Sequence, residues 1–440
     1  MANDSEGPQQ QAKATEGDQQ VTFRSLFALR EFRALYASLT INWIGDYLTR
    51  AAVTVLVYQQ TRSVLLSAIS FAVGYLPWIL FGPVLSTLGD RYPHRRVMVF
   101  CDVFRMTLTA VLLIPGLPTA LTLLILVLAS LGAPPAQAAR SALMPLVVGR
   151  DRLTLALALN NTSSQAAQVG GYLIGAAVAV SLSPRLALSL DLCTFALSAL
   201  LVATGIRSRP PGVAPAQRRH LLRETTEGFQ LVFGHPVLRS IAIVVFTTIA
   251  FSIVPESLAA SWAAEATPDG ISQGLEQGLI MAAGPFGIVV GGLLFSRLVP
   301  AERRLRLVPL LAVVTPLVLT PTLFGPPATV VAVLVALSGM AQGAGLPALN
   351  ASFALVLPAS HRARAFGVMT SGIQTSQFLA VLINGVLSER FRIPLVVGLW
   401  SIAGTVLMTA VAAFWPKPEQ FSAAERGAVS PEQARAEPAT

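Results

Sequence analysis

Long apolar stretches recur along nearly the whole chain, separated by short polar or Pro- and Gly-marked breaks. A helix needs about 20 apolar residues to cross the hydrocarbon core of a bilayer. The pattern therefore predicts an all-α membrane protein with about twelve transmembrane helices. Composition agrees, because 53% apolar and 12% charged residues cannot give 440 residues the hydrated surface of a soluble protein. The expected spans are residues 34–58, 64–88, 97–116, 120–143, 153–180, 185–205, 237–262, 278–298, 307–324, 328–352, 365–387 and 393–415.

Arginine is concentrated in alternate breaks between these spans, for example at Arg24–Arg33, Arg91–Arg96 and Arg207–Arg223. Short loops that stay in the cytoplasm are enriched in Arg and Lys, so we expect these breaks and both termini on the cytoplasmic side. The net charge of +9 is thereby dispersed over many loops, and nucleic acid is not an expected partner. The chain uses Arg with almost no Lys and is rich in Ala, which is typical of a bacterium with a GC-rich genome. We therefore expect the protein in a bacterial plasma (inner) membrane.

The order of prolines indicates a duplicated six-helix unit. Pro134 and Pro145, around the fourth span, are matched at equal separation by Pro347 and Pro358 around the tenth. Two repeats in the same order are typical of secondary transporters. The expected parts are a disordered tail at 1–21, a six-helix bundle at 22–205, a cytoplasmic linker with an amphipathic helix at 206–236, a six-helix bundle at 237–415 and a disordered tail at 416–440.

Ionisable residues inside the spans are expensive to bury and therefore mark candidate functional positions. Asp46 lies near the middle of the first span, with Asn42 one turn before it and Arg50 one turn after it on the same helical face. We expect Asp46 to load a proton that is exchanged against substrate as Arg50 moves away. The alternative is a static Asp46–Arg50 ion pair that only neutralises two charges. Glu256, which follows Pro255 in the seventh span, is a second proton site, an outer-gate contact or a carboxylate that reaches the headgroups.

Polar side chains in other spans are candidates for lining a substrate cavity. Arg140 lies low in the fourth span, where it either meets an anionic substrate or, as we expect, extends to the inner phosphates. We expect Asp191 to have a structural or gating role. Phe71, Tyr75 and Trp78 form a stripe on the second span that we expect to pack against lipid or in the core. The cavity candidates are Asn42, Gln137, Arg140, Gln168, Gln342, Asn350 and Gln374.

Enzyme chemistry has little support in the sequence. There is no metal-ligand spacing, no nucleophile–base set and no phosphate-binding Gly loop, and Cys101 and Cys193 fall inside spans as small packing residues. We therefore expect no enzyme, no cofactor and no metal. The proton that Asp46 is expected to load makes a proton gradient the expected driving force. The expected partners are a small-molecule substrate, protons and membrane lipid, and we expect a monomer.

One loop between two apolar runs, GPVLSTLGDRYPHRR at Gly82–Arg96, resembles the signature G-x-x-x-D-R-x-G-R-R of the major facilitator superfamily. The matching positions are Asp90, Arg91, Arg95 and Arg96, and the departing ones are Ser86, Pro93 and His94. The resemblance implies that the matching residues hold an inner gate. Asp102 and Arg105, at the start of the third span, would belong to the same gate network.

A second set of motifs is similar to the branch of that superfamily that contains the enterobactin exporter and macrolide-efflux proteins. It includes Gly45-Asp46, Tyr58-Gln59-Gln60-Thr61, Ala139-Arg140-Ser141-Ala142-Leu143-Met144-Pro145 and Asp191-x-x-Thr194-Phe195. The resemblance implies two pseudo-symmetric six-helix bundles, alternating access, and proton-coupled multidrug efflux of an amphipathic antibiotic, siderophore or other secondary metabolite by an antiporter. A lipid or lysophospholipid flippase of the same fold is an alternative, as is a non-transporting membrane sensor or scaffold.

Overall fold

The computed structural model describes residues 22–82, 85, 92–209, 221–266, 270–357, 362–417, 419–424 and 426, and within them every regular element is a helix. The elements are α2 (Phe23–Phe27), α3 (Arg30–Thr61), α4 (Val64–Ala72), η1 (Val73–Tyr75), α5 (Leu76–Leu80), α7 (His94–Leu112), α8 (Thr119–Ser130), α9 (Ala133–Val148), α10 (Arg150–Ser181), α11 (Pro184–Gly205), α12 (Leu221–Gly234), α13 (Pro236–Ser252), α14 (Val254–Ala266), α15 (Gly270–Leu298), α16 (Ala301–Leu317), η3 (Thr320–Phe324), α17 (Ala328–Val356), α18 (Arg362–Ser388) and α19 (Ile393–Ala413). The predicted all-α membrane class is confirmed.

Eight helices in the described part of the chain are long and apolar enough to cross a membrane. They are Thr119–Val148, Pro184–Gly205, Pro236–Ala266, Ser272–Leu298, Arg303–Phe324, Ala328–Val356, Arg364–Ser388 and Ile393–Ala413. The remaining predicted spans overlap α3, α7, α10 and the shorter apolar segment Val64–Leu80. The number twelve therefore stays a prediction.

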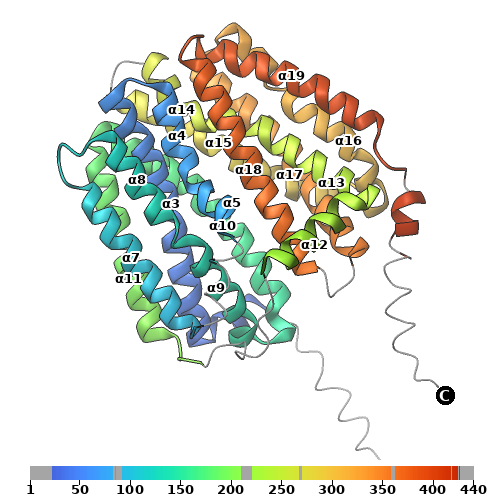
Figure 1. Ribbon diagram of the computed structural model, residues 1–440, viewed down its shortest axis with the longest axis horizontal. Coiled ribbons are helices and arrows are strands. Elements are labelled where there is room, and N and C mark those ends of the chain that lie inside the picture. The colour runs from blue at the N-terminus through green and yellow to red at the C-terminus, as the bar shows by residue number, and fades with distance from the viewer. Residues whose placement is uncertain are drawn as a thin grey trace, which may run out of the picture.

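The helices sort into two groups by their contacts (Figure 1). In the first group α3 packs against α10 and α11, and α7 packs against α9 and α11. In the second group α17 packs against α15 and α16, and α13 packs against α18. The linker helix α12 packs on α13 and α18 of the second group.

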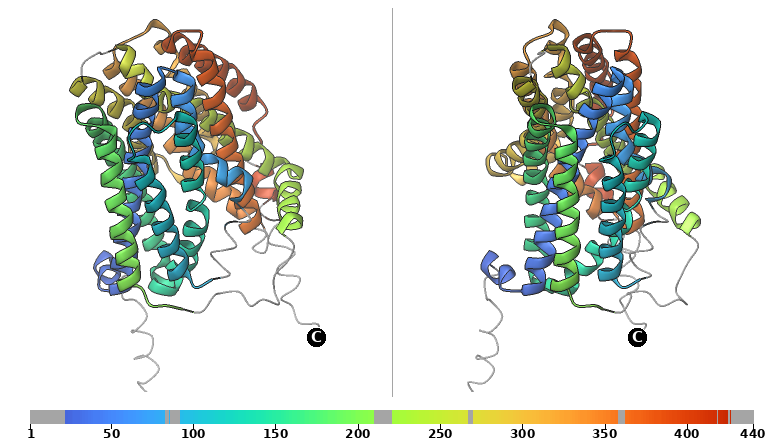
Figure 2. Two further views of the ribbon diagram at one scale, coloured as in Figure 1. Left: turned by 60° about the vertical axis from the view of Figure 1, so that its left-hand side comes forward. Right: turned by 90° about the vertical axis from the view of Figure 1, so that its left-hand side faces the viewer.

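The two groups meet mainly where α10 packs on α15 and α4 packs on α18. The contacts lie near one end of the molecule, which we call the Ser63 end; the opposite end, which carries α2 at the bottom of both views in Figure 2, is the Phe23 end. A Cβ atom on Gly274 of α15 would lie 3.0 Å from the carbonyl oxygen of Ala176, and one on Gly385 of α18 would lie 3.2 Å from the Cβ of Ala68. Small residues thus let the halves approach closely at the Ser63 end.

Glycines also bring α15 and α17 together within the second group. A Cβ atom on Gly287, Gly291, Gly339 or Gly343 would come closer than 3.0 Å to backbone atoms of the facing helix. Lipid supplies no hydrophobic driving force between helices, so association depends on such close backbone packing. The spacing of these glycines is therefore what fixes the distance between α15 and α17.

Gly343→Ala is expected to destabilise the protein by about 1–3 kcal/mol, because the added methyl group must push the backbones of α15 and α17 apart. The matched control is Gly367→Ala on α18, where a Cβ atom meets nothing within 4 Å. Thermal unfolding of the purified protein in detergent measures both effects. Equal unfolding temperatures for the two variants would contradict this description of the α15–α17 contact.

Candidate functional site

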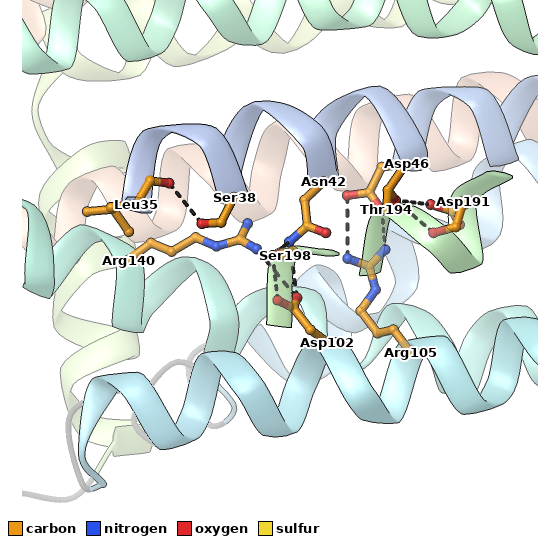
Figure 3. A network of polar contacts seen from close by, with 10 residues as sticks. All are labelled: Leu35, Ser38, Asn42, Asp46, Asp102, Arg105, Arg140, Asp191, Thr194 and Ser198. Carbon is orange, nitrogen blue, oxygen red and sulfur yellow. Dashed lines mark hydrogen bonds and ion pairs between the residues drawn. The ribbon is translucent and has the colours of Figure 1, made fainter. Parts of the chain in front are cut away.

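An ion pair between α3 and α7 lies at the centre of the first group of helices (Figure 3). Both terminal nitrogens of Arg105 point at the Asp46 carboxylate, and Nη1 donates to Oδ2 at 3.4 Å. The guanidinium also stacks on the ring of Phe195, 4.5 Å from its centroid. The pair is not sealed, because the Asp46 side chain is 31% exposed and the Arg105 side chain 14%. A charged pair that faces a cavity can exchange partners, ligands or protons.

Asp191 of α11 lies beside this pair and is itself buried. Thr49 Oγ1 donates to its Oδ2 at 2.6 Å, and Thr194 Oγ1 donates to its Oδ1 at 3.0 Å. Gly45 makes the approach possible, because a Cβ atom there would collide with both Asp191 and Thr194. The sequence Gly45-Asp46 therefore places two carboxylates, on different helices, around one guanidinium.

A second polar cluster lies one turn further toward the Phe23 end (Figure 3). Asp102 accepts hydrogen bonds from Asn42 Nδ2 at 3.0 Å and from Ser198 Oγ at 2.6 Å, and Arg140 Nη2 lies 3.8 Å from its Oδ1. The Asp102 side chain is 1% exposed and the Arg140 side chain 7%. Asp102 of α7 is thus joined to α3 and α11 by hydrogen bonds and to α9 by the opposite charge of Arg140, which fixes these four helices relative to one another.

A cavity of about 250 Å³ opens beside the Asp46–Arg105 pair. Its lining includes Asp46, Arg105, Arg140 and Asp191 from the first group and Gln374 from α18 of the second group. Arg50 also lines it, with its guanidinium over the rings of Tyr47, Phe71 and Tyr75 at 5.9, 5.1 and 5.2 Å from their centroids. The cavity thus lies within the first group, is open to the second group at Gln374, and has the mixture of charged, polar and aromatic groups that suits a small ligand.

A second cavity, of about 160 Å³, lies between α10 and the second group. Glu256 lines it and is 9% exposed, and the hydroxyl of the fully buried Tyr172 donates to its Oε1 at 2.5 Å. Since Tyr172 belongs to α10 and Glu256 to α14, this hydrogen bond crosses between the two groups. The interpretation of Glu256 as a carboxylate that reaches the headgroups is wrong, because its side chain is enclosed by protein.

The predicted partner of Asp46 is not the one that the structure gives it. Within the described residues no ion pair joins Asp46 to Arg50; Arg105 takes that place, and Arg50 turns to the aromatic rings. Asp102 and Arg105 lie in the two central clusters. The gate network that would join them to Asp90 and Arg91 falls partly outside the described residues and stays a prediction. The i, i+4 spacing indicated a neighbour on the same helix, whereas a long arginine on α7 reaches across.

The other gate candidates are only partly placed. Asp90 and Arg91 lie outside the described residues. Arg95 Nη2 donates to the carbonyl oxygen of Ala203, and Arg96 is exposed. The predicted inner gate therefore remains a prediction.

The cavity candidates divide between the two cavities. Gln137, Arg140 and Gln374 line the first, and Gln168 and Gln342 line the second. Asn42 is fully buried behind the first cavity, where it holds Asp102. The expected extension of Arg140 to the inner phosphates is wrong, because Asp102 attracts it into the core. Asn350 is a second correction, since it is exposed on α17 and lines neither cavity.

Several site residues were not expected from the sequence. The expected core packing of Phe71 and Tyr75 is confirmed, since both are buried in a hydrophobic cluster. The sequence did not indicate that Phe71 and Tyr75 also flank Arg50, or that Phe71 and Trp78 line the first cavity. Asp191 was expected to have a structural or gating role, and that role stays a prediction; the structure adds that Asp191 lines the first cavity beside the central ion pair. The motif Asp191-x-x-Thr194-Phe195 could have indicated this position, because Thr194 binds Asp191 and Phe195 stacks on Arg105.

Comparison with known proteins gives consistent matches. A sequence model of the Major Facilitator Superfamily matches residues 35–326 and 270–438. The multidrug efflux pump Tap of Mycolicibacterium fortuitum is 26% identical over 410 residues, which is 89% of this chain and 97% of the pump. Macrolide efflux protein A of Streptococcus pyogenes is 26% identical over 156 residues, which is 34% of this chain. The match spans only 38% of that curated relative.

Solved structures agree on the fold. A D-xylose–proton symporter superposes with a TM-score of 0.67 at 12% sequence identity, covering 88% of this chain and 98% of the symporter. A bacterial homologue of the human lysosomal transporter Spinster, in an inward-facing and unoccupied conformation, superposes with a TM-score of 0.64 at 14% identity, covering 91% of this chain and 98% of the homologue. At such identities the likeness concerns the fold alone.

Proposed function

Because the chain belongs to the Major Facilitator Superfamily, a family of membrane transporters, we propose that it is a secondary active exporter of amphipathic organic molecules driven by protons. The names of two relatives support export: one is a multidrug efflux pump matched over nearly its whole length, and one is a macrolide efflux protein matched in part. The proposed location is a bacterial plasma membrane, with the Phe23 end and both termini in the cytoplasm, where the Arg-rich loops would lie.

The observation that carries the proposal is the Asp46–Arg105 ion pair in the wall of a cavity within the helix bundle. A charge at membrane depth is costly unless it is paired, and it usually serves a proton, an ion or a substrate. Protonation of Asp46 would neutralise one partner and free the Arg105 guanidinium, for which Asp191 is the next acceptor around the cavity. Proton binding and the shape of the cavity would thus be coupled through one arginine.

Alternating access would follow from rocking of the two helix groups around the cavity. The groups meet at the Ser63 end, so this arrangement corresponds to a transporter that is closed there. A contact between the groups secures that end: Ser63 Oγ donates to Glu389 Oε1 at 2.6 Å, and the amide nitrogen of Leu65 donates to the same oxygen at 2.8 Å. Glu389, which directly follows α18, therefore binds the N-terminus of α4. The dipole of α4 favours a negative charge at that N-terminus.

Acidification is expected to open the Ser63 end. Hydrogen bonds from Ser63 and from the Leu65 amide lower the pKa of Glu389. Because the folded-state pKa is lowered, the contact contributes stability at pH above the ordinary value for Glu and is lost as pH falls through the lowered pKa. Spin labels at the exposed residues Leu182 and Phe324, in a variant without Cys101 and Cys193, should report longer distances at low pH.

Glu389→Gln should give the longer distances already at neutral pH and remove their pH dependence. Glu419→Gln, which changes an exposed carboxylate beyond α19, is the control and should behave like the wild type. Distances that are unchanged by pH in the wild type would contradict a role for Glu389 in closing this end.

The test of the proposed function is accumulation of labelled solutes in cells that express the protein. A macrolide, a tetracycline, a catecholate siderophore and a fluorescent lysophospholipid form the panel, each with and without an uncoupler. The proposal expects lower accumulation of at least one organic solute and loss of that difference with the uncoupler. Movement of the lysophospholipid alone, insensitive to the uncoupler, would replace the exporter by a flippase, and no difference for any solute would refute both.

A further inference from the structure

The guanidinium of Arg50 is held by aromatic rings and not by a carboxylate. It lies over Tyr47, Phe71 and Tyr75, and its Nη1 donates to the Tyr75 hydroxyl at 3.4 Å. Among the described residues no carboxylate oxygen lies within 4.0 Å of its nitrogens. A cation–π contact lowers the free-energy cost of removing a cation from water but does not neutralise its charge.

The charge pattern of the first cavity makes Arg50 different from its neighbours. Arg105 is paired with Asp46, and Arg140 lies 3.8 Å from Asp102. Asp191, the remaining carboxylate in the cavity wall, is held by threonine hydroxyls. Glu256 faces the other cavity and accepts from Tyr172. Within the part of the chain that the structure describes, Arg50 thus has no carboxylate at ion-pairing distance, and the Glu256 carboxylate acts on it only through a longer-range charge interaction.

The space around Arg50 suits a ligand. The guanidinium lies close to Gly74, where an added Cβ atom would be in contact with Nη2 at 3.4 Å, and Arg50 and Gly74 both line the first cavity. Trp43 and Trp78 line the same cavity as Phe71 and present apolar surface beside the cation. A guanidinium offers five donors in a plane and binds carboxylates through two of them, while aromatic rings bind flat apolar groups.

We propose that Arg50, with Tyr47, Phe71 and Tyr75, forms a subsite for the acidic group of an organic anion whose aromatic or other flat apolar part lies against Trp43 and Trp78. This inference rests on the proposed function and narrows its substrate class to amphipathic acids and zwitterions. The anion would supply the counter-charge at contact distance that no described carboxylate provides, so occupation of the cavity would stabilise the protein as well as bind the ligand.

The experiment is equilibrium binding to the purified protein in detergent, without any gradient. The probes are 1-naphthylacetate and its neutral amide, 1-naphthaleneacetamide, which share one ring system and differ in charge. Quenching of protein tryptophan fluorescence reports binding near Trp43 and Trp78. Wild-type protein is expected to bind the anion about tenfold or more tightly than the amide, since one charge-assisted pair is worth that much.

Arg50→Gln should reduce the ratio of the two affinities to near one and leave the affinity for the amide unchanged. Arg50→Lys keeps the positive charge but loses the planar fork, so it should retain part of the preference. Arg185→Gln, which removes an exposed arginine at the Ser63 end, is the matched control and should keep the wild-type ratio. Unchanged unfolding temperatures ensure that the comparison is made on folded protein.

Equal affinities for the two probes in the wild type would overturn the subsite, as would an anion preference that survives Arg50→Gln or the absence of binding by either probe. Because binding is measured without a gradient, these outcomes are independent of proton coupling. If the protein prefers the anion but shows no uncoupler-sensitive efflux, the subsite is supported and the proposed export function is refuted. If it exports cationic solutes but shows no preference for the anion, the export function is supported and the subsite is refuted.

Discussion

Asp46→Asn is expected to abolish uphill export while substrate exchange across the membrane continues. Asparagine keeps the size of the side chain and one oxygen for Arg105, but it can neither bind nor release a proton. One proton that moves down a gradient of about one pH unit supplies about 1.4 kcal/mol, which sustains about a tenfold concentration ratio. That ratio should collapse to one in the variant.

Two assays in proteoliposomes measure uphill transport and substrate exchange separately. Uphill transport is measured with an imposed pH gradient, and exchange of labelled against unlabelled substrate is measured without one. Asp151→Asn, which changes an exposed carboxylate in the first turn of α10, is the control and should match the wild type in both assays. If Asp46→Asn still accumulates substrate against a gradient, Asp46 does not carry the coupling proton.

Asp102→Ala is expected to cost about 3–5 kcal/mol of folding stability, since it removes the counter-charge of a buried cation. Arg140 would remain almost fully enclosed with no carboxylate beside it, and Asn42 and Ser198 would lose their shared acceptor. The measurement is the thermal unfolding midpoint in detergent. We expect a much larger decrease than for Asp151→Ala at the surface of α10.

A double variant distinguishes the loss of a charge partner from the loss of packing. Asp102→Leu combined with Arg140→Met replaces both charges by apolar groups, and it should be more stable than Asp102→Ala alone, because no unpaired charge is left in the core. If the double variant is less stable than the wild type by the full sum of the effects of Asp102→Leu and Arg140→Met measured singly, the two residues are not coupled and the ion pair does not explain the cost.

The fold class was predictable because lipid as a solvent leaves a strong pattern in the sequence. Repeated apolar stretches indicated helices, and a charge near the middle of one of them pointed to Asp46, which does lie in a cavity wall. The same reasoning chose the wrong partner. Arg50 shares a helical face with Asp46, but Arg105 comes from another helix, and periodicity along one helix carries no information on which helices are neighbours.

Burial was the other limit of sequence reasoning. Arg140 near a helix end suggested an extended side chain, and only the position of Asp102 on a neighbouring helix draws it inward. The aromatic residues Phe71 and Tyr75 fitted an ordinary packing stripe, and their role beside Arg50 depends on how α4, η1 and α3 pack. Asn350 illustrates the converse, since polarity within a span did not distinguish a cavity from an exposed face.

In the proposed mechanism, proton movement and substrate movement are coupled through the Asp46–Arg105 pair. The most direct test is the pH inside proteoliposomes, read from an enclosed dye, when a transported substrate is added outside with no other gradient. The proposed mechanism predicts a substrate-dependent flow of protons opposite to the substrate in the wild type and none in Asp46→Asn. Substrate uptake with no proton flow in the wild type, or an equal flow in both proteins, would contradict it.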